Sequence, residues 1–196
     1  LRAAGRAPYF IPEGGSNAVG SAGYLAMVPE LLAQAGILPV PPARLVCTMG
    51  SLGTFAGLWL GARAFGAPFS VTGVAVNPTT GYTREKAAAL VNEMSAAYGL
   101  DIAAAPEDMD IIYADAAHDY AGSGYNVPDA KTRGAVELLA RTEGIFLDPC
   151  YTAKSFRGFC DIARELDGGA IFVHTGGTPA LWTQEHLDAF AADYWN

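Results

Sequence analysis

The sequence predicts an α/β fold in which a parallel or mixed sheet carries helices on both faces, a three-layer arrangement. Two observations predict it. Short apolar runs of strand length alternate along the chain with longer segments whose apolar residues recur at helical spacing. Clusters of glycine, proline and asparagine separate these segments. The chain has 196 residues, half of them hydrophobic, which suits one domain with a sizeable core or a division into two lobes.

The first half of the chain alternates helices with apolar strands. One helix ends where Gly36 is followed by several prolines. Another begins at Thr83, with Glu85 in its first turn, and stops at Gly99. In chain order, the expected elements are a helix over 20–35, a strand over 44–48, a helix over 54–65, a strand over 70–76 and a helix over 83–98.

The second half continues the alternation around one long loop. The stretch HDYAGSGYNVPDA at 118–130 is rich in glycine and polar residues, which predicts a loop. The other expected elements are a strand over 109–114, a helix over 132–142, a strand over 144–149, a helix over 153–166, a strand over 169–177 and a last helix from Thr183.

Composition and charge exclude several classes of function. The net charge of −8 argues against nucleic acid and against an anionic membrane as partners. No apolar run reaches the ~18–20 residues that a membrane span needs, and the first residues lack the pattern of a signal peptide. Because Cys47, Cys150 and Cys160 lack metal-ligand spacing, we expect no metal site, reduced thiols and a cytoplasmic setting.

The turn MGSLGT at 49–54 connects an apolar strand to an apolar helix. Backbone amides at a helix N-terminus attract anions, glycines allow close approach of the backbone, and serine and threonine hydroxyls add donors. The turn therefore suits a phosphate group, although it matches neither the Walker loop nor GxGxxG. A tight turn capped by serine and threonine explains these residues equally well. A second glycine turn, HTGGTP at 174–179, ends another strand and could face the same cleft.

Five motifs occur in an order seen in one group of enzymes. Together they resemble the C-terminal part of D-cysteine desulfhydrases and 1-aminocyclopropane-1-carboxylate deaminases, which are pyridoxal-phosphate enzymes of the tryptophan-synthase-β-like fold. The resemblance extends from Pro8 to Leu181. The motifs are IPEGGSNAVGSAGY (11–24), TMGSLGTFAGL (48–58), GYNVPDA (124–130), EGIFLDPCYTAKSFRG (143–158) and IFVHTGGTPAL (171–181).

The resemblance implies roles for specific residues. Pyridoxal 5′-phosphate is the expected cofactor, and Tyr125 and Tyr151 are expected to face it, where a phenol can transfer a proton or position a carboxylate. On the residues alone, two core or interface tyrosines explain these positions better. Leu52 stands where the family more often has a small residue, so it would contribute its backbone amide. The implied contacts of the cofactor phosphate are Thr48, Gly50, Ser51, Leu52, Gly53 and Thr54.

Thr152 is expected to contact the cofactor and to distinguish the two activities. The deaminases have a glutamate here that bonds the pyridine nitrogen, whereas the desulfhydrases have a threonine. A neutral hydroxyl leaves the ring a weaker electron sink than a carboxylate does. Elimination of a good leaving group requires a weaker electron sink than opening of a cyclopropane ring does. Thr152 therefore favours the desulfhydrase. The alternative is that Thr152 caps the helix over 153–166.

The resemblance also implies that further residues complete the enzyme. The family's Schiff-base lysine lies upstream of the GGSN motif, and none of Lys86, Lys131 and Lys154 has its context. We therefore expect a C-terminal portion that is inactive alone. In this portion, residues 1–22 end the small lobe and cross over, and residues 23–196 belong to the large cofactor-binding lobe. The full-length protein is expected to be a homodimer.

Three functions remain open from the sequence. The first is a lyase that eliminates the β-substituent of a small amino acid such as D-cysteine, giving pyruvate, ammonia and sulfide. The second is a 1-aminocyclopropane-1-carboxylate deaminase, which the threonine at 152 disfavours. The third is a domain that binds a phosphate ligand without catalysis. Among the histidines, His174 is expected to be structural and His186 to be solvated.

Overall fold

The computed structural model describes residues 1–195, so the last residue of the lobe expected over 23–196 lies outside the described residues. Short 3₁₀ turns cover Arg2–Ala4 (η1), Glu13–Gly15 (η2), Pro106–Asp108 (η3) and Thr178–Trp182 (η4). The strands are β1 (Pro42–Met49), β2 (Ser70–Ala75), β3 (Ile111–Ile112) and β4 (Gly169–Val173). The helices are α1 (Ala18–Ala35), α2 (Gly53–Ala64), α3 (Arg84–Ala97), α4 (Ala130–Glu143), α5 (Thr152–Glu165) and α6 (Gln184–Trp195).

The four strands form a parallel sheet in the order β3-β2-β1-β4, which confirms the expected α/β class. In the centre, Leu45 of β1 pairs with Val71 of β2 on one side and with Ile171 of β4 on the other. The expected strand over 109–114 is reduced to Ile111 and Ile112, because only two register pairs join it to β2.

One expected strand is wrong. Residues 144–149 have the apolar pattern of a strand but pair with no strand of the described chain, and Ile145 and Phe146 are about half exposed. The segment turns into α5 at Asp148, whose carboxylate accepts the backbone amides of Cys150 and Tyr151. Because these bonds bend the chain toward the helix, the segment cannot continue as a ladder.

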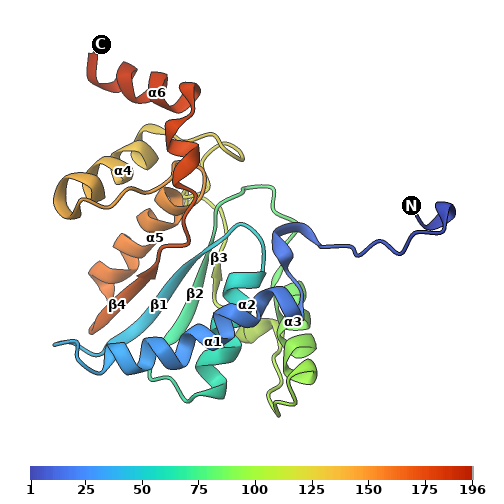
Figure 1. Cartoon of the computed structure of the whole chain (residues 1–196). Coiled ribbons are helices and arrows are strands. Elements are labelled where there is room, and N and C mark those ends of the chain that lie inside the picture. The colour runs from blue at the N-terminus through green and yellow to red at the C-terminus, as the bar shows by residue number, and fades with distance from the viewer. Residues whose placement is uncertain (196) are drawn as a thin grey trace.

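Helices cover both faces of the sheet, as expected (Figure 1). On one face, α2 packs against β1 and β2, and α1 and α3 pack on α2. The other face is covered by α5, with α4 outside it. The side chains of β1 alternate accordingly, because Leu45 and Cys47 belong to the α2 side of the core and Val46 to the α5 side. None of the described helices is both long and apolar enough to cross a membrane.

Helices α1 and α2 approach each other closely along a stripe of glycines. A Cβ on Gly57 would lie 2.6 Å from the backbone oxygen of Ser21, and one on Gly61 would lie 2.6 Å from Val28 Cγ2. Only glycine therefore fits at these two positions. The first glycine of the stripe, Gly53, opens α2 and donates its amide to Ser16 Oγ at 3.0 Å. The stripe thus ties the start of α2 to the segment before α1.

Candidate active site

A cleft of about 350 Å³ opens where β1 and β4 end. In parallel α/β sheets, ligands bind at the carboxyl ends of the strands. Five separate parts of the chain meet there: the segment around the GGSN motif, the β1–α2 turn, the loop that carries Tyr125, the start of α5 with Tyr151, and the glycine turn after β4. The lining residues are Glu13, Gly14, Thr48, Gly50, Ser51, Thr54, Tyr125, Tyr151, Thr175, Gly176 and Gly177.

The β1–α2 turn presents unpartnered amides. Among the described residues, the backbone N–H groups of Gly50, Ser51, Leu52 and Thr54 have no hydrogen-bond partner. Gly53 differs from the expectation, because its amide is already donated to Ser16. The amides of Leu52 and Thr54 are free donors of the kind that helix N-termini carry, and those of Gly50 and Ser51 come from the turn just before α2, at its positive end.

The side chains of the turn divide between the cleft and the core. Ser51 and Thr54 line the cleft, whereas Leu52 is 5% exposed and packs in the core. Leu52 therefore offers only its amide, which explains how a large residue is accommodated there. Thr48 lines the cleft, and its Oγ1 lies 2.5 Å from Ser155 Oγ of α5.

The GGSN segment lies directly against this turn. Gly14 has a positive φ of 63°, and a Cβ there would lie 2.1 Å from Ser51 Oγ. Any side chain at position 14 would therefore collide with the turn. Glu13 also lines the cleft, which the sequence analysis missed because a glutamate before two glycines carries no distinctive signal.

Tyr125 and Tyr151 lie together, as expected. Their ring centroids are 5.6 Å apart in an edge-to-face arrangement. Tyr151 packs on Gly50, where a Cβ would lie 3.2 Å from its Cε1. Burial, followed by the negative charge of Glu13, raises the pKa of Tyr151 above its usual value. The phenol of Tyr151 is therefore protonated at neutral pH and can donate a proton or a hydrogen bond.

Thr152 is not among the residues that line the cleft. Its side chain is fully buried, and its hydroxyl donates to Asp148 Oδ1 at 2.7 Å and accepts the Asp148 amide at 2.9 Å. The Asp148 carboxylate also accepts the amides of Tyr151 and Thr152, so this carboxylate, and not the Thr152 hydroxyl, binds the free amides at the start of α5. The capping alternative is wrong as well, because Thr152 is itself the first residue of α5 and its hydroxyl, held by two bonds to Asp148, accepts none of the described amides of that helix.

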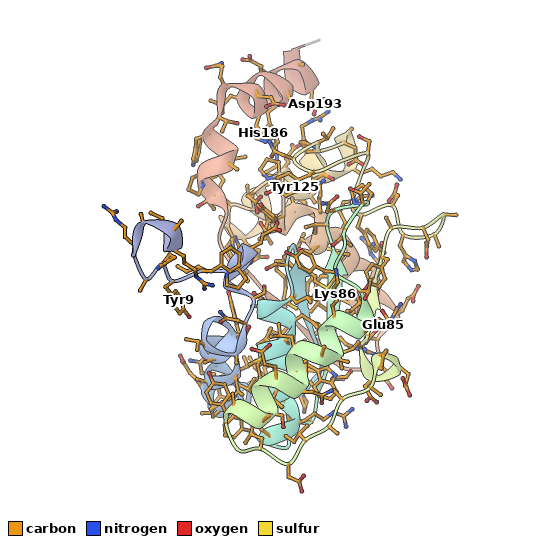
Figure 2. The ribbon with its side chains drawn as sticks, turned by 90° about the vertical axis from the view of Figure 1, so that its right-hand side faces the viewer. Tyr9, Glu85, Lys86, Tyr125, His186 and Asp193 are labelled. Atoms are coloured by element: carbon orange, nitrogen blue, oxygen red, sulfur yellow. The ribbon has the colours of Figure 1, made fainter. Side chains whose placement is uncertain are left out.

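Two histidines and one threonine near the cleft remain to be placed. His174 bonds the backbone at both ring nitrogens, to Phe146 O at 2.9 Å and to the Gly176 amide at 3.1 Å, which fits a structural role. The expectation for His186 is wrong, because it is 2% exposed and its Nε2 lies 3.1 Å from Asn126 Oδ1, beside Tyr125 (Figure 2). Thr175 places a further hydroxyl in the cleft.

The residues present fit a phosphate group. The free amides of the β1–α2 turn, the hydroxyls of Ser51 and Thr54 and the positive end of α2 are all suited to a dianion. Gly14 and Gly50 leave room that a Cβ would fill. Fold and cleft are those of the α/β proteins that hold phosphorylated small molecules at the carboxyl ends of parallel strands.

The comparison with protein families specifies that phosphorylated group. Residues 1–176 match the family described as pyridoxal-phosphate dependent enzyme. The chain therefore belongs to the family of pyridoxal-phosphate-dependent enzymes, and pyridoxal phosphate is the cofactor of that family.

Individual relatives agree with this assignment. A D-cysteine desulfhydrase from Yersinia enterocolitica is 35% identical over 186 residues, which are 93% of this chain and 54% of the relative. A Pyrococcus abyssi protein, provisionally named a 1-aminocyclopropane-1-carboxylate deaminase, is 33% identical over 184 residues, 93% of this chain and 53% of the relative. The crystal structure of an ACC deaminase homologue is similar, with a TM-score of 0.82 and 28% sequence identity. The match covers 97% of this chain and 55% of the chain in that crystal structure. The chain spans about half the length of these relatives.

Proposed function

We propose that this chain is the C-terminal portion of an amino-acid lyase of the D-cysteine desulfhydrase type, with residues 1–22 and 23–196 in the lobes assigned above. The reaction is α,β-elimination from a small amino acid, giving pyruvate, ammonia and sulfide. One observation carries the proposal: a single cleft gathers the β1–α2 turn with its free amides, two tyrosines and the glycine turn after β4.

The residues of the cleft divide into two groups. The β1–α2 turn holds the cofactor phosphate through the amides of Gly50, Ser51, Leu52 and Thr54, with Ser51 and Thr54 hydroxyls beside them. Gly53 orients the turn through Ser16. When bound, pyridoxal phosphate supplies an electron sink that acidifies the α-carbon of an amino acid.

The tyrosines act on the substrate side of the cleft. Tyr151 Oη stays protonated at neutral pH, so it can deliver a proton to the sulfur as the bond to the β-carbon breaks. Tyr125, at 54% exposure, stands at the open side and can hold the substrate carboxylate by a hydrogen bond. The edge-to-face contact between the rings favours one relative orientation of the two side chains.

The cleft favours the desulfhydrase over the deaminase. Apart from the carboxylate of Glu13, which directly precedes the GGSN motif, the polar side chains among its described lining residues are neutral hydroxyls. Neutral hydroxyls beside the cofactor ring leave it a weaker electron sink than a carboxylate would, and a weaker sink suffices for loss of a thiolate. The deaminase is the second candidate, because the Pyrococcus protein and the solved structure carry that name.

The three lysines support inactivity of this chain alone. Lys86 Nζ donates to Gly81 O, Lys131 pairs with Asp119, and Lys154 is buried with its ammonium bonded to backbone carbonyls. None of the three lines the cleft. We therefore expect borohydride reduction with pyridoxal phosphate to give no stoichiometric adduct at any of them. A stoichiometric adduct with pyruvate release from D-cysteine would contradict this part of the proposal.

The test of the phosphate site uses pyridoxine 5′-phosphate, which lacks the reactive aldehyde, and inorganic phosphate as its competitor. The purified chain is expected to bind both at one site. Thr54→Val removes a lining hydroxyl and is expected to weaken binding about two- to tenfold. Thr142→Val, on the outer helix α4 and away from the cleft, is the matched control. Absence of competition, or an equal effect of both variants, would refute the site.

The choice of reaction is tested on the longer protein that contains this chain. Release of sulfide from D-cysteine is expected. Release of ammonia from 1-aminocyclopropane-1-carboxylate, without sulfide from D-cysteine, would favour the deaminase instead.

A further inference from the structure

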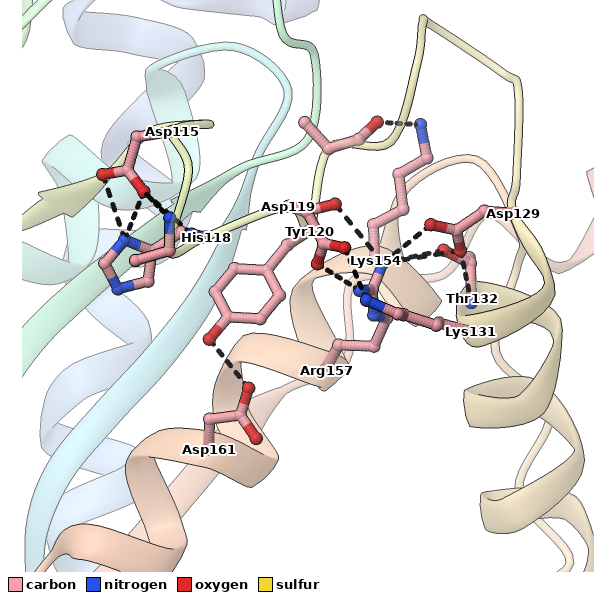
Figure 3. A network of polar contacts seen from close by, with 12 residues as sticks. Asp115, His118, Asp119, Tyr120, Asp129, Lys131, Thr132, Lys154, Arg157 and Asp161 are labelled. Carbon is pink, nitrogen blue, oxygen red and sulfur yellow. Dashed lines mark hydrogen bonds and ion pairs between the residues drawn. The ribbon is translucent and has the colours of Figure 1, made fainter.

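Lys154 is a fully buried lysine that the function proposed above does not use. It lies in the first turn of α5, three residues after Tyr151. Its ammonium donates to Ala121 O at 2.7 Å and to Gly124 O at 2.8 Å, and a longer contact of 3.4 Å reaches Val76 O. Figure 3 shows Lys154 among the neighbouring polar side chains. An ammonium has three N–H donors, so these three carbonyls satisfy it completely.

The carbonyls belong to the loop that carries Tyr125. This loop, residues 121–127, is tightly folded, because Gly122 and Asn126 both have positive φ and Gly124 forms an isolated bridge with Val127. The Gly124 oxygen accepts both the Val127 amide and the Lys154 ammonium. Tyr125 immediately follows that anchored carbonyl.

The opposite end of the loop has its own anchor. His186 of α6 contacts the Asn126 side chain, so the residue after Tyr125 is held as well as the residue before it. The two anchors come from different helices. Tyr125 therefore stands between two fixed points, although its own side chain is half exposed.

Space filling alone does not account for a lysine at this position. Burial lowers the pKa of Lys154, which means that the protein environment disfavours its charged form. No carboxylate of the described residues forms an ion pair with it. A methionine of similar length would fill the space without the desolvation cost, but it could not bind the carbonyls.

We infer that Lys154 is a positioning residue, which fixes Tyr125 against Tyr151 by binding the carbonyls of Ala121 and Gly124. This inference rests on the proposed function of the cleft. It concerns the ring-binding side of the cleft and is expected to leave the phosphate turn unaffected, because the hydrogen bonds of Lys154 among the described residues go to other segments.

The test exploits that separation by using two ligands. Lys154→Met is expected to weaken binding of pyridoxine 5′-phosphate roughly two- to tenfold, the range of an aromatic contact. Binding of inorganic phosphate is expected to stay unchanged. Lys131→Met is the matched control, since Lys131 is an exposed lysine paired with Asp119 outside the cleft. Equal losses for both ligands would show a general structural role and overturn the inference.

A double-mutant cycle with Tyr125→Ala tests whether Lys154 acts through Tyr125. If it does, Lys154→Met causes no further loss of pyridoxine 5′-phosphate affinity once Tyr125 is replaced. Additive losses would overturn the inference. Should Lys154→Met not fold, Lys154→Arg takes its place, because it keeps the donors but is too large to hold the loop in its present position.

Hydrogen exchange separates this inference from the proposed function. Lys154→Met is expected to speed amide exchange over residues 121–127, whereas exchange in α2 stays as in the wild type. If the wild-type chain binds neither ligand, the proposed function fails, and the exchange data alone decide the role of Lys154. Unchanged exchange over 121–127 would overturn the inference whatever the ligands do.

Discussion

Replacing Gly57 by alanine tests the close approach of α1 and α2 beneath the cleft. The new Cβ would lie 2.6 Å from Ser21 O, 2.7 Å from Tyr24 Cβ and 3.1 Å from Leu25 N, whereas ordinary contacts begin at 3.4 Å. Two of these atoms are backbone and cannot rotate away, so α1 must move by roughly 0.8 Å.

The expected size of the effect combines two opposing terms. Overpacking of this kind costs about 2–3 kcal/mol, the upper part of its usual range. Alanine in a helix interior gains about 1 kcal/mol over glycine. The net loss in the free energy of unfolding is therefore about 1–2 kcal/mol, which lowers Tm by roughly 2–8 °C in a chain of this size.

Gly23→Ala provides the matched control. Gly23 lies in α1, and a Cβ there would meet nothing within 4 Å. The same substitution is therefore expected to raise the stability by about 1 kcal/mol. Both variants are measured by thermal unfolding under identical conditions. If Gly57→Ala stabilises the chain as much as Gly23→Ala does, the glycine stripe is not a close contact and the reasoning is wrong.

Three further predictions concern other buried groups. Burial and the hydrogen bond to Asp161 raise the pKa of Tyr120 to about 12, so the folded chain keeps a proton that the unfolded chain loses above pH 10. Stability therefore falls by up to about 2.7 kcal/mol between pH 10 and 12; denaturant titrations should find this fall smaller in Tyr120→Phe, and an equal fall would contradict the assignment. Asp148→Ala removes the acceptor of three backbone amides and is expected to lower the free energy of unfolding by about 2–4 kcal/mol. Denaturant unfolding measures this loss. Asp148→Asn keeps one oxygen and is expected to lower the free energy of unfolding by less. Burial raises the pKa of Cys47 to about 12, so a thiol reagent is expected to leave it unmodified until denaturant is added, as peptide mass would show.

The sequence was most informative where local pattern and tertiary structure agree. Strands β1 and β2 follow directly from apolar runs, and the cap at Thr83 follows from residue type. The segment over 144–149 has the same apolar signal as a strand. In that segment, the Asp148 carboxylate accepts the amides of Cys150 and Tyr151 and turns the chain toward α5. The spacing of apolar residues gives no sign of such side-chain hydrogen bonds.

The candidate site shows the same limit. Ordered motifs predicted that the β1–α2 turn, Tyr125 and Tyr151 would meet, and all of them line one cleft. The orientations of Thr152 and His186 were not predictable, because each depends on one hydrogen-bond partner. For Thr152 that partner is four residues away, and for His186 it is on a separate loop. A hydroxyl or an imidazole can bond a ligand in a cleft or another group of the protein equally well. The residue type alone therefore does not predict which partner the side chain takes.

The position of β1 in the sheet has a consequence for how the protein folds. One neighbour of β1 is the next strand in sequence, but the other is β4, the last strand of the described chain. During synthesis, that edge of β1 stays unpaired until nearly all of this chain has emerged. Unpaired apolar edges are templates for association between chains. Because the cleft lies where these two strands end, its assembly waits for the strand pairing with the largest sequence separation in the sheet, and the partly folded chain is exposed to aggregation until β4 docks.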